Sequence, residues 1–315
     1  MPIDAIRRLL RASANVESAS LWRRASQDVA LYGVSIKCSN GRSAFCGMVR
    51  YDGQTDSAAF QNLLANLIFM AAMKCQQIWH ELPTRPRDAR CHWYFSVLSH
   101  LDDAHLIGQH PSRLLKVSLD TLDLAYGRHS PVALDLRGQS VSLGQIRQIA
   151  TRVGRLAWIE DPPPDIPIAN LSSHSRAIAF GETCRTAAEL YAAQKQLDTA
   201  TALIYNLELS KLGPRELVGA ARRGHREGVQ VVLHGHLPFD MALLTHLLPA
   251  RSMIEINVPY LRQRNGYQDR RLGLHEQLEL VDAISTDPRL AGPVMSKVAP
   301  EDCLCLGDLP LDARA

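Results

Sequence analysis

Eight short apolar runs, separated by amphipathic segments, restrict the fold of this chain more than any other feature. They lie at residues 92–97, 113–119, 131–136, 155–160, 176–182, 201–207, 229–234 and 252–258. Helical patterns connect most of them, at residues 142–153, 186–197, 214–228 and 239–248. Because strands that alternate with helices form parallel sheets, and eight such strands can close on themselves, the sequence predicts an α/β fold with a (β/α)8-type (modified TIM) barrel.

The first connections of this barrel are short, and a different pattern precedes them. About 15 residues separate the first two runs, and little beyond residues 121–130 lies between the second and the third. Upstream, apolar and polar residues alternate around Asn40-Gly41, which predicts a hairpin, and a helical pattern runs from about residue 56 to 80. The expected parts are an α+β domain at residues 1–90, a trimmed barrel at 91–260, and a tail at 261–315 that packs back on the first part.

The composition is typical of a soluble globular enzyme and excludes several other classes. The 315 residues carry a net charge of +3, without the basic footprint of a nucleic-acid binder. No apolar run reaches the roughly 18 residues of a membrane span, and the first thirty residues hold no secretory signal. The seven cysteines lack disulfide spacing, which indicates reduced thiols and a cytoplasmic location. We expect neither a nucleic-acid nor a membrane partner, and homo-oligomerisation is left open.

Three carboxylates stand at the ends of three successive apolar runs. Asp135, Glu160 and Glu182 each close a run, at spacings of 25 and 22 residues, about one strand–helix unit each. Considered singly, Asp135 also fits a turn residue, Glu160 a solvated loop acid and Glu182 a helix cap. Together they indicate a site, because equivalent ends of neighbouring parallel strands meet at one rim of a barrel. Carboxylates from three neighbouring strands predict a binding site for a hard divalent cation.

Most of the remaining runs also carry an ionisable residue at or just beyond their ends: Lys116, Glu208, His234, His236 and Glu255. A packed barrel interior is dominated by branched apolar residues, so polar groups gathered toward one rim indicate a site. We expect one of the two histidines in this site and the other in a loop.

Several of these residues have a structural alternative. Lys116 could extend from a strand to the rim, and Glu208 could pair with Lys211 at the surface. His246, on a predicted helix, is interpreted as a packing histidine. Further candidates for ligand contact, which the sequence does not rank, are Arg137, Tyr205 and Asn206.

The motifs around the three carboxylates resemble those of the enolase superfamily, in the branch of mandelate racemases, muconate-lactonising enzymes and o-succinylbenzoate synthases. Residues 132–138 (VALDLRG) resemble the Asp-x-Asn-Gly strand end of that branch. Residues 158–162 (WIEDP) and 178–183 (IAFGET) resemble its Trp-Ile-Glu-Glu/Asp-Pro and Ile-Ala-x-Gly-Glu-Ser/Thr motifs. The resemblance implies that the N-terminal part and the tail form a capping domain over the substrate. It also implies Mg²⁺, or Mn²⁺ in its place, as the cofactor, held by Asp135, Glu160 and Glu182.

Departures from the family pattern bear on the chemistry. Of the usual Lys-x-Lys pair only the second lysine, Lys116, is kept, and Arg137 replaces the usual Asn. Glu208 stands where many members have a lysine, and members with an acid there use it to orient a histidine on the next strand, here His234 or His236. Glu255 matches an acid that donates a hydrogen bond to the substrate carboxylate in some members. The resemblance thus implies Lys116 as the base on one face of the substrate and a Glu208–histidine pair on the other.

The expected function is Mg²⁺-dependent removal of the proton next to a carboxylate, through a metal-stabilised enediolate. Racemisation, epimerisation, β-elimination and cycloisomerisation all remain open, so the chain is expected to be an isomerase or a lyase acting on a small-molecule carboxylate. The departures motivate a second interpretation, a catalytically degenerate enolase-like barrel that serves as a binding or scaffold subunit. A third is an unrelated metal-dependent barrel lyase or aldolase in which Lys116 forms a Schiff base.

Overall fold

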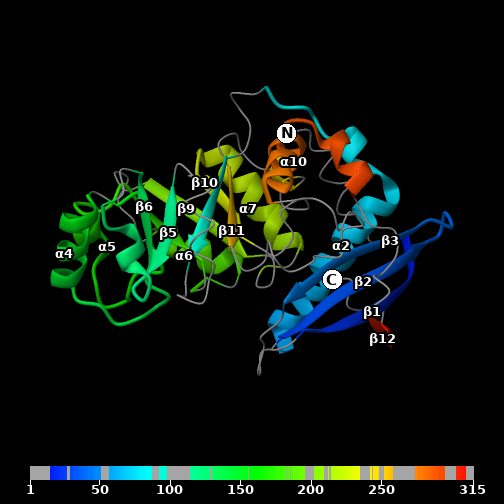
Figure 1. Cartoon of the computed structure of the whole chain (residues 1–315), viewed down its shortest axis with the longest axis horizontal. Helices are drawn as coiled ribbons and strands as arrows, with labels where there is room; N and C mark the ends of the chain where they lie inside the picture. The colour runs from blue at the N-terminus through cyan, green and yellow to red at the C-terminus, as the bar shows by residue number, and fades with distance from the viewer. Residues whose placement is uncertain are drawn as a thin grey trace.

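A computed structural model shows a barrel beside a smaller sheet-and-helix part (Figure 1). It describes residues 15–26, 29–50, 57–86, 92–97, 114–127, 130–154, 156–181, 183–184, 186–195, 202–208, 212, 214–234, 242, 244–247, 252–257, 274–294 and 303–309. Among these residues, none of the helices combines the length and the apolarity that a bilayer crossing requires.

The barrel is closed by eight parallel strands in chain order, with the last strand pairing the first. They are β4 (His92–Val97), β5 (Leu115–Ser118), β6 (Val132–Asp135), β7 (Ile159–Glu160), β8 (Ala177–Phe180), β9 (Ala202–Glu208), β10 (Gln230–His234) and β11 (Met253–Asn257). Each lies within, or within one residue of, a predicted run, so the barrel predicted from the sequence is confirmed. The shortest strand, β7, is preceded by an isolated bridge from Leu156 to Ser175 and is followed closely by Pro162 and Pro163, which cannot donate a backbone hydrogen bond.

Helices cover the outside of the barrel between the later strands (Figure 1). They are α4 (Leu143–Val153), α5 (Ile168–Leu171), α6 (Ala187–Lys195) and α7 (Pro214–Glu227). α4 begins at a capping box in which Ser142 and Gln145 each bond the other's backbone N–H. In place of a helix, the described residues between β5 and β6 contain only the short 3-10 turn η4 (Leu122–Ala125), as the short connection predicts.

The barrel interior holds an apolar cluster together with polar side chains toward the C-terminal ends of the strands. The apolar cluster consists of small, branched and aromatic side chains: Tyr94, Ala133, Trp158, Ala177, Ala179, Ile204 and Val232. Since side chains alternate along a strand, the residue two places later points the same way and lies nearer the rim. Ala133, Trp158 and Ile204 are thus followed by Asp135, Glu160 and Asn206, all of them buried.

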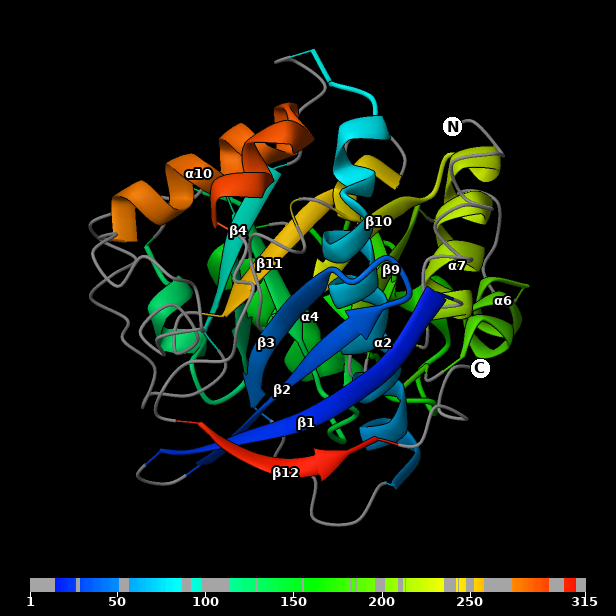
Figure 2. The same cartoon turned by 90° about the vertical axis from the view of Figure 1, so that its right-hand side faces the viewer.

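The smaller part is an antiparallel sheet in the order β12-β1-β2-β3, with a helix packed on one face (Figure 2). Its strands are β1 (Val16–Ser26), β2 (Val29–Cys38), β3 (Ser43–Arg50) and β12 (Leu304–Asp308), and the helix is α2 (Ser57–Gln76). The predicted hairpin is confirmed: Gly41 has φ 75°, and Asn40 accepts a hydrogen bond from the Arg42 N–H at 3.0 Å. Neither β1 nor β12 was indicated by the sequence pattern.

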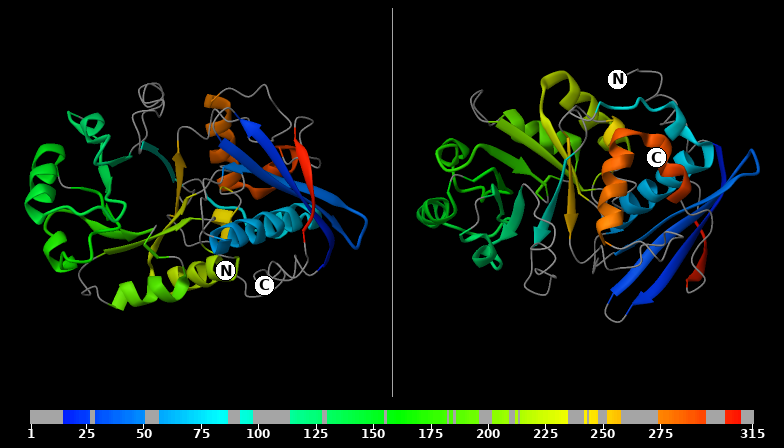
Figure 3. Two further views of the ribbon diagram at one scale, coloured as in Figure 1. Left: turned by 90° about the horizontal axis from the view of Figure 1, so that it is seen from below. Right: turned by 45° about the horizontal axis from the view of Figure 1, so that its top comes forward.

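In the described part of the tail, α10 (Leu274–Thr286) lies on the side of the barrel that faces the smaller sheet, and the 3-10 helix η6 (Pro288–Val294) follows it (Figure 3). Trp93 of β4 donates a hydrogen bond to Asp282 of α10 at 3.1 Å. The buried His246, in the 3-10 turn η5 (Thr245–Leu247), places its ring nitrogens 2.9 Å from the Pro83 carbonyl oxygen and 2.7 Å from that of Ile284 in α10. The interpretation of His246 as a packing histidine is confirmed.

Candidate metal centre

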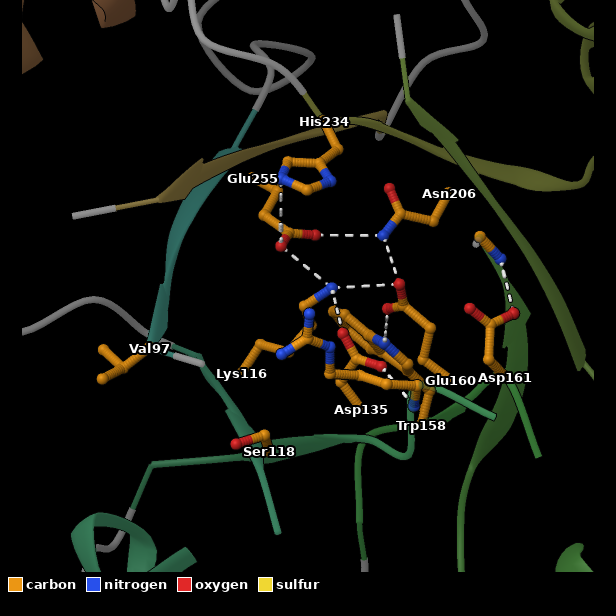
Figure 4. Close-up of polar contacts among 12 residues, drawn as sticks. Val97, Lys116, Ser118, Asp135, Trp158, Glu160, Asp161, Asn206, His234 and Glu255 are labelled. Atoms are coloured by element: carbon orange, nitrogen blue, oxygen red, sulfur yellow. Dashed lines mark hydrogen bonds and ion pairs between the residues drawn. The ribbon is translucent and has the colours of Figure 1, made fainter. Parts of the chain in front are cut away.

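Polar side chains from six barrel strands converge inside the barrel near its C-terminal rim (Figure 4). They are Lys116 of β5, Asp135 of β6, Glu160 of β7 with the following Asp161, Asn206 of β9, His234 of β10 and Glu255 of β11. All except His234 are almost completely buried. Since buried charge is unfavourable unless it is paired, the contacts among these groups show what the site is built to hold.

The side chains of Asp135, Glu160 and Asp161, here named the acid cluster, could hold a metal ion. Each offers a carboxylate oxygen, and these atoms lie within 4.8 Å of one another. Two of the three predicted ligands are therefore together, whereas Glu182 lies outside the described residues. Asp161 was not predicted as a ligand, because strict alternation would point it away from Glu160. Its φ of 47° ends the alternation, and a non-glycine residue with positive φ often marks a functional position.

Hydrogen bonds fix the orientation of Asp161. Its Oδ1 accepts from the Gly181 N–H at 2.9 Å and from the Thr183 hydroxyl at 2.6 Å. A Cβ at Gly181 would lie 2.8 Å from Glu160 Oε1, so any other residue here would displace this carboxylate oxygen. The ends of β7 and β8 are thus held close together around the acid cluster.

The ammonium of Lys116 forms ion pairs with three carboxylates. Its Nζ lies 3.2 Å from Asp135 Oδ2, 3.0 Å from Glu160 Oε1 and 2.9 Å from Glu255 Oε1. Burial lowers the pKa of Lys116, but the three carboxylates outweigh burial and raise that pKa well above its ordinary value. Lys116 is therefore a positively charged group in this arrangement.

The strand register shows how deep Lys116 lies. Lys116 is opposite Ala133 of β6, and Ser118 is opposite Asp135. Lys116 is therefore one inward-facing position deeper than the residue level with the first acid, and that residue is a serine. The role of Lys116 as a catalytic base stays a prediction.

Glu160 accepts hydrogen bonds on both of its carboxylate oxygens. Besides Lys116, its Oε1 accepts from Asn206 Nδ2 at 2.6 Å, and its Oε2 accepts from Trp158 Nε1 at 3.3 Å. Burial raises the pKa of Glu160; Lys116 opposes this, but Asp135 and Glu255 add to it, so the pKa lies well above the usual range for a carboxyl. Without an additional cation nearby, Glu160 therefore favours its protonated form more than an exposed glutamate does.

Glu255 does not belong to the acid cluster and has donors of its own. Its Oε2 accepts from the Tyr94 hydroxyl at 2.8 Å and from Asn206 Nδ2 at 3.0 Å. Burial alone would raise the pKa of Glu255, but His234 and Lys116 outweigh burial and lower that pKa to about 2. Glu255 is therefore ionised at neutral pH in this arrangement and accepts hydrogen bonds. The role that the family resemblance implies for it, donation of a hydrogen bond to the substrate carboxylate, requires a proton on Glu255 and stays a prediction.

Of the predicted second acid–base pair, the structure describes the side chain of His234. His234 is opposite both Glu208 of β9 and Glu255 of β11 in the strand register. Its Nε2 lies 3.8 Å from Glu255 Oε1, which is an ion-pair distance but too long for a hydrogen bond. The side chain of Glu208 and all of His236 lie outside the described residues, so the Glu208–histidine pair stays a prediction.

The other candidates for ligand contact lie on different sides of the barrel wall. Asn206 lies in the site, whereas the hydroxyl of Tyr205 donates to Gln194 of α6 at 2.5 Å and therefore faces the outer helices. Arg137 contributes its backbone N–H, which donates to Asp135 Oδ1 at 2.9 Å.

Negative charge exceeds positive charge in the described part of this site. Four carboxylates, those of the acid cluster and Glu255, surround one ammonium, that of Lys116, in a buried volume. Unpaired buried carboxylates either take up protons or bind a cation. Oxygen donors in this number and spacing fit a hard divalent cation such as Mg²⁺ or Mn²⁺.

No protein-family model and no curated protein matches the chain. Solved structures do resemble it. A mandelate racemase/muconate lactonizing enzyme from a Jannaschia species aligns with 15% identity over 77% of this chain and 86% of its own, at a TM-score of 0.56. A mandelate racemase/muconate lactonizing enzyme-like protein from a Roseovarius species aligns with 14% identity over 77% and 85%, at the same TM-score of 0.56. A racemase from Streptomyces coelicolor with bound magnesium aligns with 15% identity over 76% and 91%, also at 0.56. The chain has the fold of these proteins, which is the fold that the motif resemblance implies.

Proposed function

We propose that this protein is a metal-dependent enzyme that removes the proton next to a carboxylate group. The observation that carries the proposal is the buried acid cluster at the C-terminal rim of the barrel, with more negative charge than the neighbouring cations balance. The fold shared with mandelate racemase-like proteins, one of them a racemase with bound magnesium, supports it. The product could be an epimer, an elimination product or a cycloisomer, so the protein is an isomerase or a lyase.

The chain's own residues would bind the ion and orient the substrate. A bound Mg²⁺ or Mn²⁺ would supply the positive charge that stabilises the dianion formed when such a proton leaves. Asp135, Glu160 and Asp161 would hold the ion, and Glu182, at the end of the next strand, is a further candidate ligand. Burial at the barrel mouth excludes water, so each charge acts more strongly there than at the surface.

Lys116 and His234 are the described residues that could accept the proton. Lys116 lies against the acid cluster and is the proposed base on one face, provided that it first gives up its own proton. His234 approaches from β10, on another side of the site, and is the proposed group for the opposite face. Two proton-transfer groups on opposite faces would permit racemisation or loss of a β-substituent.

A specific observation also favours the second candidate function, a barrel that binds without catalysing. Lys116 is fixed in three ion pairs, and the position level with Asp135 on the same strand is Ser118. A serine hydroxyl is a far weaker base than an amine, so a chain that needs no proton transfer could keep this arrangement.

Proton exchange in D₂O tests the proposal directly. A library of small carboxylic acids would be incubated with the protein and Mg²⁺ and followed by NMR for loss of the α-proton signal, with Glu160→Gln as the matched control. We expect exchange on at least one acid with the parent protein and none with the variant. Metal binding without exchange across the library would instead favour the non-catalytic barrel, and absence of metal binding would contradict the proposed metal site.

A further inference from the structure

We propose that Lys116 is a tethered cation that competes with the divalent ion for Asp135 and Glu160 and so sets the metal affinity of the site. This inference rests on the metal site of the proposed function and adds a positioning role that the family resemblance does not assign to this lysine. The inference follows from the donors that already contact the carboxylate oxygens of Asp135 and Glu160.

Every carboxylate oxygen of Asp135 and Glu160 has a donor. Asp135 Oδ1 accepts from the Arg137 N–H at 2.9 Å, and Glu160 Oε2 accepts from Trp158 at 3.3 Å. The two remaining oxygens, Asp135 Oδ2 and Glu160 Oε1, lie 3.2 and 3.0 Å from the Nζ of Lys116. Among the donors that the described residues supply to these two acids, only the ammonium of Lys116 is charged, and only Lys116 spans both acids.

The other donors to these acids are uncharged. The Arg137 donor is a backbone N–H, and Trp158 is a buried ring that also packs edge-on against Tyr94, with ring centroids 5.4 Å apart. Asn206 Nδ2, which donates to Glu160 Oε1 at 2.6 Å, is a neutral amide. None of the three repels a cation as strongly as an ammonium does, since like charges at contact distance repel most in a buried site. Lys116 has a flexible four-carbon stem, so it is the group that can yield.

Glu255 provides the place to which Lys116 can yield. Its Oε1 is 2.9 Å from Nζ, and its Oε2 is fixed by Tyr94 and Asn206. Glu255 does not belong to the acid cluster. When an ion holds Asp135 and Glu160, the ammonium keeps a carboxylate partner, so neither cation is left unpaired. In the absence of an ion, the ammonium stabilises the same two acids, which makes the metal-free protein a folded state with a filled site.

Titration calorimetry of the metal-free protein with MgCl₂ and with MnCl₂ tests this role. The variants are Lys116→Met, which removes the charge, and Lys116→Gln, which keeps a polar side chain. The matched control is Lys74→Met, because Lys74 is also a buried lysine but donates to the Phe45 carbonyl oxygen at 3.4 Å in the smaller domain. Loss of a group that supports a metal ligand lowers metal affinity by about 10–100-fold. Because Lys116 opposes the ion, its removal should act in the other direction with a similar magnitude, so both Lys116 variants should bind the ion about tenfold more tightly than the parent, and the control should match the parent.

Competition by Lys116 also predicts an effect on the melting temperature, which can be measured without catalytic activity. Without metal, both Lys116 variants should melt at a lower temperature than the parent, because Asp135 and Glu160 lose their counter-ion. Added Mg²⁺ should raise their melting temperatures more than it raises that of the parent.

The outcomes separate this inference from the proposed function. If the parent binds metal and either Lys116 variant binds it equally or more weakly, competition by Lys116 is wrong, while the metal site of the proposed function stands. If neither the parent nor the variants bind metal, the metal site is wrong and the inference falls with it. If Lys116→Met does not fold, the comparison between the parent and Lys116→Gln decides.

Discussion

Two buried basic side chains, His246 and Lys116, each join distant segments of the chain, and their partners differ in kind. His246 joins the segment that precedes the barrel, the turn η5 and the tail helix α10 through the carbonyl oxygens of Pro83 and Ile284. Burial lowers the pKa of His246, and the two carbonyl oxygens oppose that effect. Lys116 joins β6, β7 and β11 through carboxylates only.

The difference shows how a packing contact can be told from a functional one. The partners of His246 are neutral, so the contact leaves no net charge to be balanced. The partners of Lys116 bring three negative charges against one positive charge, and Asp161 adds another within reach. A buried polar contact that is balanced holds elements together, whereas one with excess charge is prepared for a ligand that supplies the missing charge.

The largest expected effect is a loss of metal affinity when a carboxylate partner of Lys116 is removed. Glu160→Gln removes a carboxylate from the acid cluster together with a partner of Lys116. Because even groups that only contact a ligand change metal affinity by 10–100-fold, loss of a ligand should weaken Mg²⁺ binding by more than about 100-fold. Calorimetry measures this, with the exposed Glu279→Gln on α10 as a matched control. Equal affinity in Glu160→Gln and the parent would remove the acid cluster as a metal site.

Replacement of His246 should lower the stability of the fold and leave metal affinity unchanged. A neutral imidazole donates through one ring nitrogen, so His246→Leu leaves one of the two carbonyl oxygens, of Pro83 or Ile284, without its donor, and we expect the free energy of unfolding to fall by about 1–3 kcal/mol. Denaturant unfolding measures the loss, and metal titration of the folded variant should match the parent. A change in metal affinity comparable to that of Glu160→Gln would erase the distinction between the two contacts.

Glu255 allows the charged contact to be followed through pH in the metal-free protein. Its pKa is lowered from 4.5 to about 2 in the folded state, so ionised Glu255 stabilises the fold above pH 4.5, and that contribution disappears as the pH falls toward 2. Relative to Glu255→Gln, the parent should be more stable by about 3 kcal/mol at pH 6. The difference should shrink steadily below pH 4.5. A difference that does not depend on pH would mean that Glu255 contributes through packing.

The smallest expected effect concerns the orientation of Asp161. Thr183→Val removes the hydroxyl that donates to Asp161 Oδ1 at 2.6 Å but leaves the Gly181 N–H in place. We expect metal affinity to fall by about tenfold, the low end for a group that orients a ligand. Thermal unfolding should change little, because Thr183 is exposed. Unchanged affinity would show that Asp161 does not contribute to metal binding.

Much of the fold and part of the site follow from local sequence. The apolar runs marked all eight barrel strands because the strands of a parallel barrel are buried on both faces and are therefore mostly apolar along their length. The same runs located Asp135 and Glu160, since the chain direction alone places the ends of parallel strands at one rim. The pattern of residues around Asn40-Gly41 was sufficient for the hairpin because the turn is local.

Other features depend on contacts between distant segments. β12 is a short, exposed strand whose only described strand partner is β1, almost 300 residues earlier, so its own residues carry little signal of it. Asp161 joins the acid cluster because its backbone departs from strand geometry, and a pattern based on alternation would place it elsewhere.

The sequence by itself determined that this chain forms a parallel barrel with carboxylates at the rim, because strand direction and side-chain alternation are local properties. Only the tertiary structure decided that Lys116 lies among Asp135, Glu160 and Glu255. That placement depends on the register between β5 and β6 and on the closure of β11 against β4, which brings Glu255 around the barrel to the lysine. Register and closure arise from the packing of all eight strands at once, and no short segment of the chain contains that information.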